Sequence, residues 1–177
     1  MRKWFKRDGN ADDKAQHKRA QVAWETANRL FEQGNVQDLA APLREAAELG
    51  HTEAMTNLGV VLHQEGRDAE AEQWWQRAAR QGSIDSMYNL GNFCMKNRRV
   101  LDGERWLARA AEAGHLQAMS DLGVFLFQAG QVSDAKDLWT RAARQGNAAA
   151  ARNLEVFRVA DAALKEPDRR GRNRRPR

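Results

Sequence analysis

The chain has 177 residues, of which 42% are hydrophobic and 30% charged, a composition that suits one soluble globular domain. A single cysteine, Cys94, excludes an internal disulfide framework and a cysteine-rich zinc site. No stretch approaches the roughly 18 apolar residues of a membrane helix, and no apolar run follows the basic start, so we expect a cytoplasmic protein.

The positive charge is concentrated at the two ends of the sequence. The net charge is +5, but residues 1–20 carry +4 and residues 166–177 carry another +4, which leaves −3 for 21–165. Basic ends with little to bury are typical of solvated, unfolded segments. We therefore predict a disordered basic arm at 1–18 and a disordered Arg-rich tail at 166–177.

Between these ends, one pattern recurs every 32 residues. Its most regular mark is a glycine preceded by a pair of alanines, at Gly50, Gly82, Gly114 and Gly146. A Leu-Gly pair follows eight residues after the first three of these glycines. Self-similarity at a fixed period indicates that one supersecondary unit is repeated.

Each unit predicts two helices, as the stretch 51–82 illustrates. The first helix presents an apolar face at helical spacing, formed by Ala54, Leu58, Val61 and Leu62. A Gly-Arg-Asp turn interrupts it, and Asp68 is placed to cap the second helix. Gly82 then ends the second helix in a left-handed conformation. Ser83 and Asn147, which follow their unit glycines, are predicted N-caps of the next helices.

Small residues also recur in the middle of the first helices. A glycine there costs about 0.5–1 kcal/mol relative to alanine, so Gly59, Gly91 and Gly123 are expected to let a neighbouring helix approach closely. Tryptophans supply the bulk on the other side of the contact, at Trp74, Trp75, Trp106 and Trp139. Since neither helix buries its face alone, consecutive pairs must stack, which predicts an all-α fold, an α-solenoid of antiparallel helix pairs.

The predicted solenoid covers residues 19–165. Its parts are the units 19–50, 51–82, 83–114 and 115–146, and a capping helix at 147–165.

Two strings carry a family resemblance: Trp75–Gly91, WQRAARQGSIDSMYNLG, and Trp106–Gly123, WLARAAEAGHLQAMSDLG. They resemble the Sel1-like repeat, a relative of the tetratricopeptide repeat. The resemblance is close in the second, third and fourth units and weaker in 19–50, where Pro42 takes a tryptophan position. The loops between helices are shorter than in Sel1-like units, which leaves the superhelical pitch open.

The resemblance implies a non-catalytic scaffold or adaptor whose first helices line a concave groove for a peptide or helix of a partner protein. The groove positions carried over to this sequence are Trp24, Asn28, Phe31, Thr56, Val60, His63, Tyr88, Asn92, Met95, Lys96, Ser120, Phe127 and Arg152. Aromatic and methionine side chains among polar ones suit an anchor-and-rim surface. The alternative is that the aromatic members simply pack between neighbouring helices.

The charges near this groove bear on its ligand. Tetratricopeptide domains that bind a C-terminal carboxylate use a Lys or Arg followed one turn later by an Asn. The corresponding pairs here are Trp24/Asn28, Thr56/Val60, Tyr88/Asn92 and Ser120/Val124, so we expect no such clamp. Glu53 and Asp85 favour a neutral or basic ligand instead. A different class of function remains open, in which residues 1–18 and 166–177 make weak contact with nucleic acid or an anionic membrane. Trp4 and Phe5, between pairs of cations, would supply membrane anchors.

Nothing in the sequence predicts catalysis, a cofactor, a metal or a small-molecule substrate. No Ser-His-Asp or Cys-His arrangement, phosphate-binding loop or carboxylate pair stands out from the repeat. Cys94 aligns with leucines in the other units and is interpreted as a small buried hydrophobe. His51 and His115 occupy equivalent positions at helix starts, 64 residues apart, and are interpreted as cap residues rather than ligands.

Overall fold

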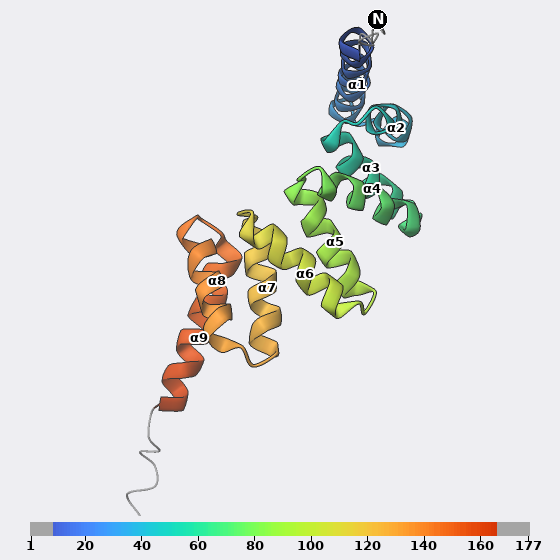
Figure 1. Ribbon diagram of the computed structural model, residues 1–177. Coiled ribbons are helices and arrows are strands. Elements are labelled where there is room, and N and C mark those ends of the chain that lie inside the picture. Colours follow the sequence, from blue (N-terminus) through green and yellow to red (C-terminus); the bar gives the residue numbers. More distant parts are fainter. Residues whose placement is uncertain (1–8, 166–177) are drawn as a thin grey trace, which may run out of the picture. The chain divides into compact units, whose positions relative to one another are not determined.

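The computed structural model describes residues 9–165, with side chains from 11 to 160. All regular structure in this range is helical, which confirms the predicted all-α class (Figure 1). The elements are α1 (Gly9–Glu32), the 3₁₀ turn η1 (Val36–Asp38), α2 (Ala40–Glu48), α3 (Thr52–Gln64), α4 (Asp68–Arg80), α5 (Ile84–Lys96), α6 (Val100–Glu112), α7 (Leu116–Gln128), α8 (Val132–Arg144) and α9 (Ala148–Lys165).

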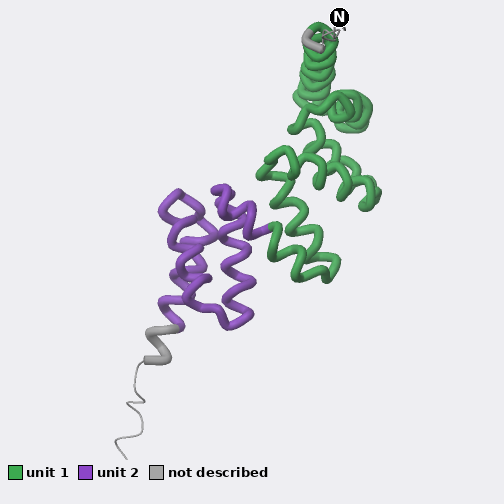
Figure 2. Tube along the Cα trace, in the orientation of Figure 1, with its two compact units in different colours: residues 1–106 green, residues 107–177 purple. Residues whose placement is uncertain are grey.

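Contacts divide the chain into two compact units, residues 1–106 and residues 107–177 (Figure 2). In the first unit α1 packs on α2, α2 on α3, α3 on α4 and α4 on α5. In the second unit α7 packs on α8, α8 on α9, and α7 also contacts α9. Each unit is thus built from consecutive antiparallel helices, as the repeat predicts.

The helix ends explain why the repeat marks recur. Gly82 has φ +93°, the left-handed conformation expected after a helix. Arg98 also adopts a left-handed conformation, with φ +59°, at a position where the other 32-residue repeats have glycine. The predicted N-caps at two later helices are confirmed. Ser83 Oγ accepts the backbone N–H of Ser86 at 3.2 Å, and Asn147 Oδ1 accepts that of Ala150 at 2.8 Å.

The predicted cap role of Asp68 is wrong. The N-cap of α4 is Arg67, whose side chain makes no capping bond, and Asp68 is the first residue inside the helix. Its carboxylate Oδ1 lies 2.6 Å from His63 Nδ1 on the preceding helix. Because Asp68 lies one residue inside α4 rather than at the N-cap, its side chain contacts the end of α3 instead of capping its own helix.

The glycines in the middle of the first helices act as predicted at two positions. The Trp75 indole lies where a Cβ on Gly59 would be, and Trp139 covers Gly123 in the same way. Each indole Nε1–H donates to the backbone carbonyl three residues before the glycine that it covers. Trp75 donates to Thr56 at 3.1 Å, and Trp139 donates to Ser120 at 3.0 Å. Glycine at these positions lets the indole lie directly against helix backbone.

In the third repeat the two helices approach closely at a different glycine. Leu107 stands in the register of Trp75 and Trp139, so no indole covers Gly91 from that position. Gly103 of α6 takes over the close approach, because a Cβ there would lie 3.0 Å from the Gly91 carbonyl oxygen.

Helix α1 departs from the expected disorder of residues 1–18. It begins at Gly9, so residues 9–18 are helical, and α1 is 24 residues long against 13 in α3. Between Gly9 and the end of α1 the sequence contains no proline or further glycine, and Asp12 lies in the first turn, where acidic side chains favour a helix. Residues 1–8 and 166–177, which contain the rest of the expected arms, lie outside the described residues.

Helix α9 differs from the other first helices on one face. Glu155 and Arg158 stand in the registers of Gly59 and Leu62, three periods later. Their side chains form an exposed ion pair with an N–O distance of 2.9 Å. The face that receives an indole or a leucine in earlier repeats is therefore charged in α9.

Candidate functional site

Two depressions lie beside the first helices of the first unit. The acidic depression, of about 540 Å³, is lined by Trp24, Thr52, Glu53, Thr56, Asn57, Gln81, Gly82, Ser83, Ile84 and Asp85. The apolar depression, of about 740 Å³, is lined by Ala27, Asn28, Phe31, Val36, Gln37, Leu39, Leu43, Asn57, Val60, Val61, Gln64 and Glu65. Volumes of this order are typical of sites that bind small groups or side chains.

The acidic depression combines an aromatic surface with carboxylates. The Trp24 ring stacks on His51, with centroids 4.9 Å apart and planes at 26°. Glu53 and Asp85 are both exposed at its edge. An indole beside carboxylates can attract a cationic side chain through the ring face and by charge.

His51, on which the Trp24 ring stacks, is the N-cap residue of α3. Its Nδ1 accepts the backbone N–H of Ala54 at 3.4 Å, which requires a neutral ring. The Glu53 carboxylate lies 3.3 Å from the same nitrogen. If the ring were protonated, Nδ1–H would donate to this carboxylate instead of accepting the backbone N–H. Partial burial outweighs this carboxylate and lowers the pKa of His51 below its usual value of 6.5.

This lowered pKa predicts a stability that falls in mild acid. Because the pKa is lower in the folded than in the unfolded state, the contribution is fully present above about pH 6.5 and is lost as pH falls through the folded value. We expect His51→Asn, which keeps a capping side chain as Asn147 does, to remove this loss. Urea unfolding of both proteins between about pH 8 and pH 5 measures it. A stability difference that stays constant across that range would contradict the prediction.

The apolar depression has a buried floor and an exposed rim. Leu39 and Leu43 of α2 are 7% and 3% exposed and form the floor together with Ala27 of α1. On the rim, Phe31 is 67% exposed and Val36 is 59% exposed. Large apolar side chains that stand this far into solvent beside a depression are typical of interaction surfaces.

The predicted groove residues of the first unit divide between these two depressions and α5. Trp24 and Thr56 line the acidic one, and Asn28, Phe31 and Val60 line the apolar one. His63 is half-buried, with its ring 5.7 Å from that of Trp75 and 5.8 Å from that of Phe93. Along α5 the half-buried members are Tyr88, Asn92 and Met95, with Lys96 exposed at its end.

Two predicted groove residues are buried rather than presented on a surface. Thr56 is 7% exposed, and its hydroxyl lies 3.0 Å from that of Ser83 and 2.8 Å from that of Ser86. Ser120 is 2% exposed and accepts the side-chain N–H of Asn153 at 3.5 Å. Both small hydroxyls fit where one first helix packs against the next, so their register points between helices.

The second unit holds the remaining predicted residues on α7 and α9. Phe127 is 43% exposed and its ring contacts those of Trp139 and Phe157, with centroids 5.7 Å and 6.1 Å away. Arg152 of α9 is exposed. Phe127 therefore combines the two alternatives of the sequence, since it packs between helices and remains partly open to solvent.

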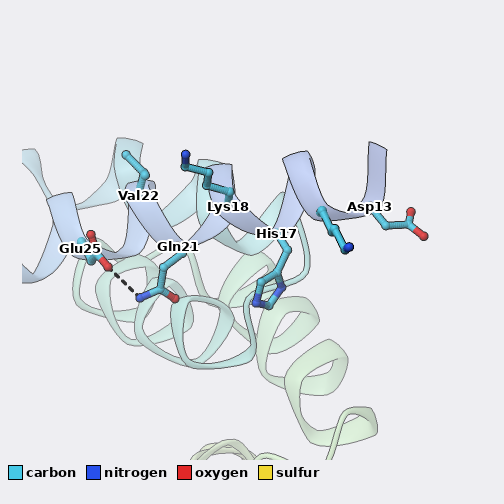
Figure 3. Close-up of a pocket in the computed structure, with 7 residues that line it drawn as sticks. Asp13, His17, Lys18, Gln21, Val22 and Glu25 are labelled. Carbon is cyan, nitrogen blue, oxygen red and sulfur yellow. Dashed lines mark hydrogen bonds between the residues drawn. The ribbon is translucent and has the colours of Figure 1, made fainter. Parts of the chain in front are cut away.

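A third depression runs along one side of α1, and sequence reasoning did not find it because the segment was expected to be disordered. Its side chains come from α1 alone and include Asp13, His17, Lys18, Val22 and Glu25 (Figure 3). Since all of its lining residues belong to one helix, this depression has no opposite wall. The helical extension does carry exposed cations before the first repeat.

Three further features of the described residues concern metals, the single cysteine and membranes. Within 9–165 no group of three His, Cys, Asp or Glu is arranged to hold a metal ion. Cys94 is buried, as predicted, and its Sγ lies 2.7 Å from a guanidinium nitrogen of Arg99. None of the described helices is long and apolar enough to cross a membrane.

Both a family model and solved structures of helical repeat proteins are similar to this chain. Residues 52–80 match the tetratricopeptide repeat model. The chain matches no curated protein sequence. Among solved structures, pilF of Pseudomonas aeruginosa aligns with a TM-score of 0.68 at 18% identity, over 84% of this chain and 72% of that one.

Two further solved structures are similar. The antigen c5321 of uropathogenic Escherichia coli, which displays an SLR fold, has a TM-score of 0.65 at 25% identity; 80% of this chain covers about a third, 32%, of that one. YrrB, a TPR protein with an unusual peptide-binding site, has a TM-score of 0.61 at 22% identity, over 89% and 86% of the two chains. Residues 52–80 are thus a tetratricopeptide repeat, and the stacked helix pairs have the fold of tetratricopeptide and Sel1-like repeat proteins.

Proposed function

We propose that this protein is a non-catalytic scaffold that binds a peptide or helix of a partner protein along its first helices. One observation carries the proposal: α1 and α3 line two neighbouring depressions in the first unit, with Phe31 and Val36 exposed beside them. Apolar anchors beside a polar rim suit protein recognition. The fold is generally used in this way, and one structural neighbour is described as having a peptide-binding site.

The second candidate function is contact with nucleic acid or an anionic membrane through the basic ends. The exposed Lys14 and Lys18 on the α1 extension favour it, because exposed cations can contact phosphates. Such binding is expected to weaken steeply as salt rises, whereas binding to the helix surface is not. Either activity is compatible with the cytosol, which we propose as the compartment.

A site-specific photo-cross-linker on the full chain tests the proposed function. Asn92 on α5 is the preferred position, because it is half-buried and lies outside the register in which Thr56 and Ser120 are buried. Gln73, exposed on the second helix α4, is the matched control. Extracts are treated with nuclease before illumination, and cross-linked products are identified by mass spectrometry.

The expected result is a defined protein adduct from position 92, insensitive to nuclease and salt, and none from position 73. Adducts of equal yield at both positions would show that the first helices are not the binding surface. Capture that disappears with nuclease or at high salt would assign binding to the basic ends instead.

A further inference from the structure

An aromatic cluster recurs where neighbouring first helices meet a second helix. In the first unit, Trp75 of α4 lies between His63 of α3 and Phe93 of α5, with ring centroids 5.7 Å and 5.9 Å away. Trp139 and Phe127 repeat this contact in the second unit. Such edge and tilted ring contacts fill the space between three helices with side chains of this chain.

The first repeat has smaller residues in the same registers. One period before Trp75 and Phe93 stand Leu43 and Val61, and one period before His63 stands Phe31. Leu43, Val61 and Phe31 all line the apolar depression. The depression of about 740 Å³ therefore coincides with the cluster position at which leucine replaces tryptophan and valine replaces phenylalanine.

Alanine at position 27 keeps α2 from filling this space with an indole of its own. Ala27 stands in the register of Gly59, where a Cβ would overlap the indole of Trp75. Ala27 and Leu43 thus form a matched pair, as Gly59 and Trp75 do. Apolar side chains still surround the space, with Phe31 as its exposed wall.

The elements around the apolar depression carry net negative charge, although Glu45 is ion-paired with Arg19 from outside this stretch. Residues 21–65, which form the second half of α1, η1, α2 and α3, contain seven Asp or Glu and two Lys or Arg, a net charge of −5. The charged side chain in the lining itself is Glu65, and it is engaged by Arg67 at 3.2 Å. Net negative charge around an apolar depression favours ligands whose flanks are cationic.

We propose that the apolar depression binds the indole side chain of a tryptophan in a partner segment flanked by Lys or Arg. This deepens the proposed function and rests on it. The indole enters beside Phe31 and lies over Leu43 and Val61, while the flanking cations face the net negative charge of residues 21–65. Buried tryptophan anchors contribute a large share of binding energy at interfaces of this kind.

The test uses the full chain and the peptide acetyl-Lys-Lys-Trp-Lys-Lys-amide, followed by the methyl NMR signals of Leu43, Val61 and Val36. Matched peptides replace Trp by Ala, or each Lys by Glu. Two variants fill the depression with the repeat's own residues: the double variant Ala27→Gly with Leu43→Trp, and the single variant Val61→Phe. Ala27→Gly alone is the control that leaves the depression open, and circular dichroism verifies the helical fold of each variant.

We expect saturable shifts with the Trp peptide, and affinity about 30-fold weaker in both filled variants and for the Ala peptide, with Ala27→Gly close to wild type. Equal affinity in the filled variants, or equal affinity for the Glu-flanked peptide, would overturn the proposal. So would a wild-type dimer that ignores the peptide and dissociates in the filled variants, because a second copy would then occupy the depression. A retained adduct at position 92 with no peptide binding would reject this site and leave the proposed function standing.

Discussion

Replacing Trp75 by alanine is expected to lower the free energy of unfolding by about 3–5 kcal/mol. The side chain is 3% exposed, it lies on the backbone at Gly59, and its Nε1–H donates to the Thr56 carbonyl at 3.1 Å. Truncation removes the apolar contacts and leaves a cavity bordered by the rings of His63 and Phe93. Urea unfolding, followed by helical circular dichroism, measures the loss.

The neighbouring Trp74 is the matched control for this prediction. It is half-buried, and the guanidinium carbon of Arg77 lies 5.2 Å from its ring centroid. Trp74→Ala is expected to cost clearly less than Trp75→Ala, because part of its side chain is already in solvent and its cation–π contact contributes only about 0.5–1 kcal/mol. Equal losses in the two variants would show that the position of Trp75 has no special role.

Gly59→Ala is expected to destabilise the protein by about 1–3 kcal/mol, against the sign of its helix propensity. In an exposed helix interior this substitution stabilises by about 0.5–1 kcal/mol, because alanine restricts the unfolded chain. Here the new methyl group would overlap the Trp75 indole, which is held by its own hydrogen bond. The free energy of unfolding of the single variant decides the sign.

A double-mutant cycle separates this clash from other effects of the methyl group. Gly59→Ala combined with Trp75→Leu reproduces the pair Ala27 and Leu43 of the first repeat. We expect the double variant to be more stable than the sum of the single losses predicts, by about 1–3 kcal/mol. Additive losses would mean that glycine and tryptophan are not coupled, and would also weaken the matched-pair argument for the apolar depression.

Much of the fold is predictable from the sequence because its signals are local and repeated. The turn glycine, the capping residue after it and the apolar face each depend on a few neighbouring residues, and their recurrence every 32 residues removes ambiguity. The caps at Ser83 and Asn147 and the close approach at Gly59 follow from such signals. The helical class was predictable for the same reason.

The rest depends on packing that one repeat does not specify. The family resemblance places Thr56 and Ser120 on the groove surface, but their small hydroxyls are buried where first helices meet. Residues 9–18 were assigned to disorder from charge, although their composition also suits a helix that extends α1. The apolar depression arises from differences between repeats, at Leu43 and Val61, which a search for shared marks passes over.

The ion pair on α9 restricts how such an array can change in length during evolution. A duplicated copy of residues 115–146 inserted before 147 would meet a matching helix surface on each side, because the registers continue across the junction. A further second helix placed after α9 would bring its indole onto Glu155 and Arg158 and would desolvate both charges. Insertion of an internal repeat is therefore expected to be tolerated better than a second helix packed on this face of α9.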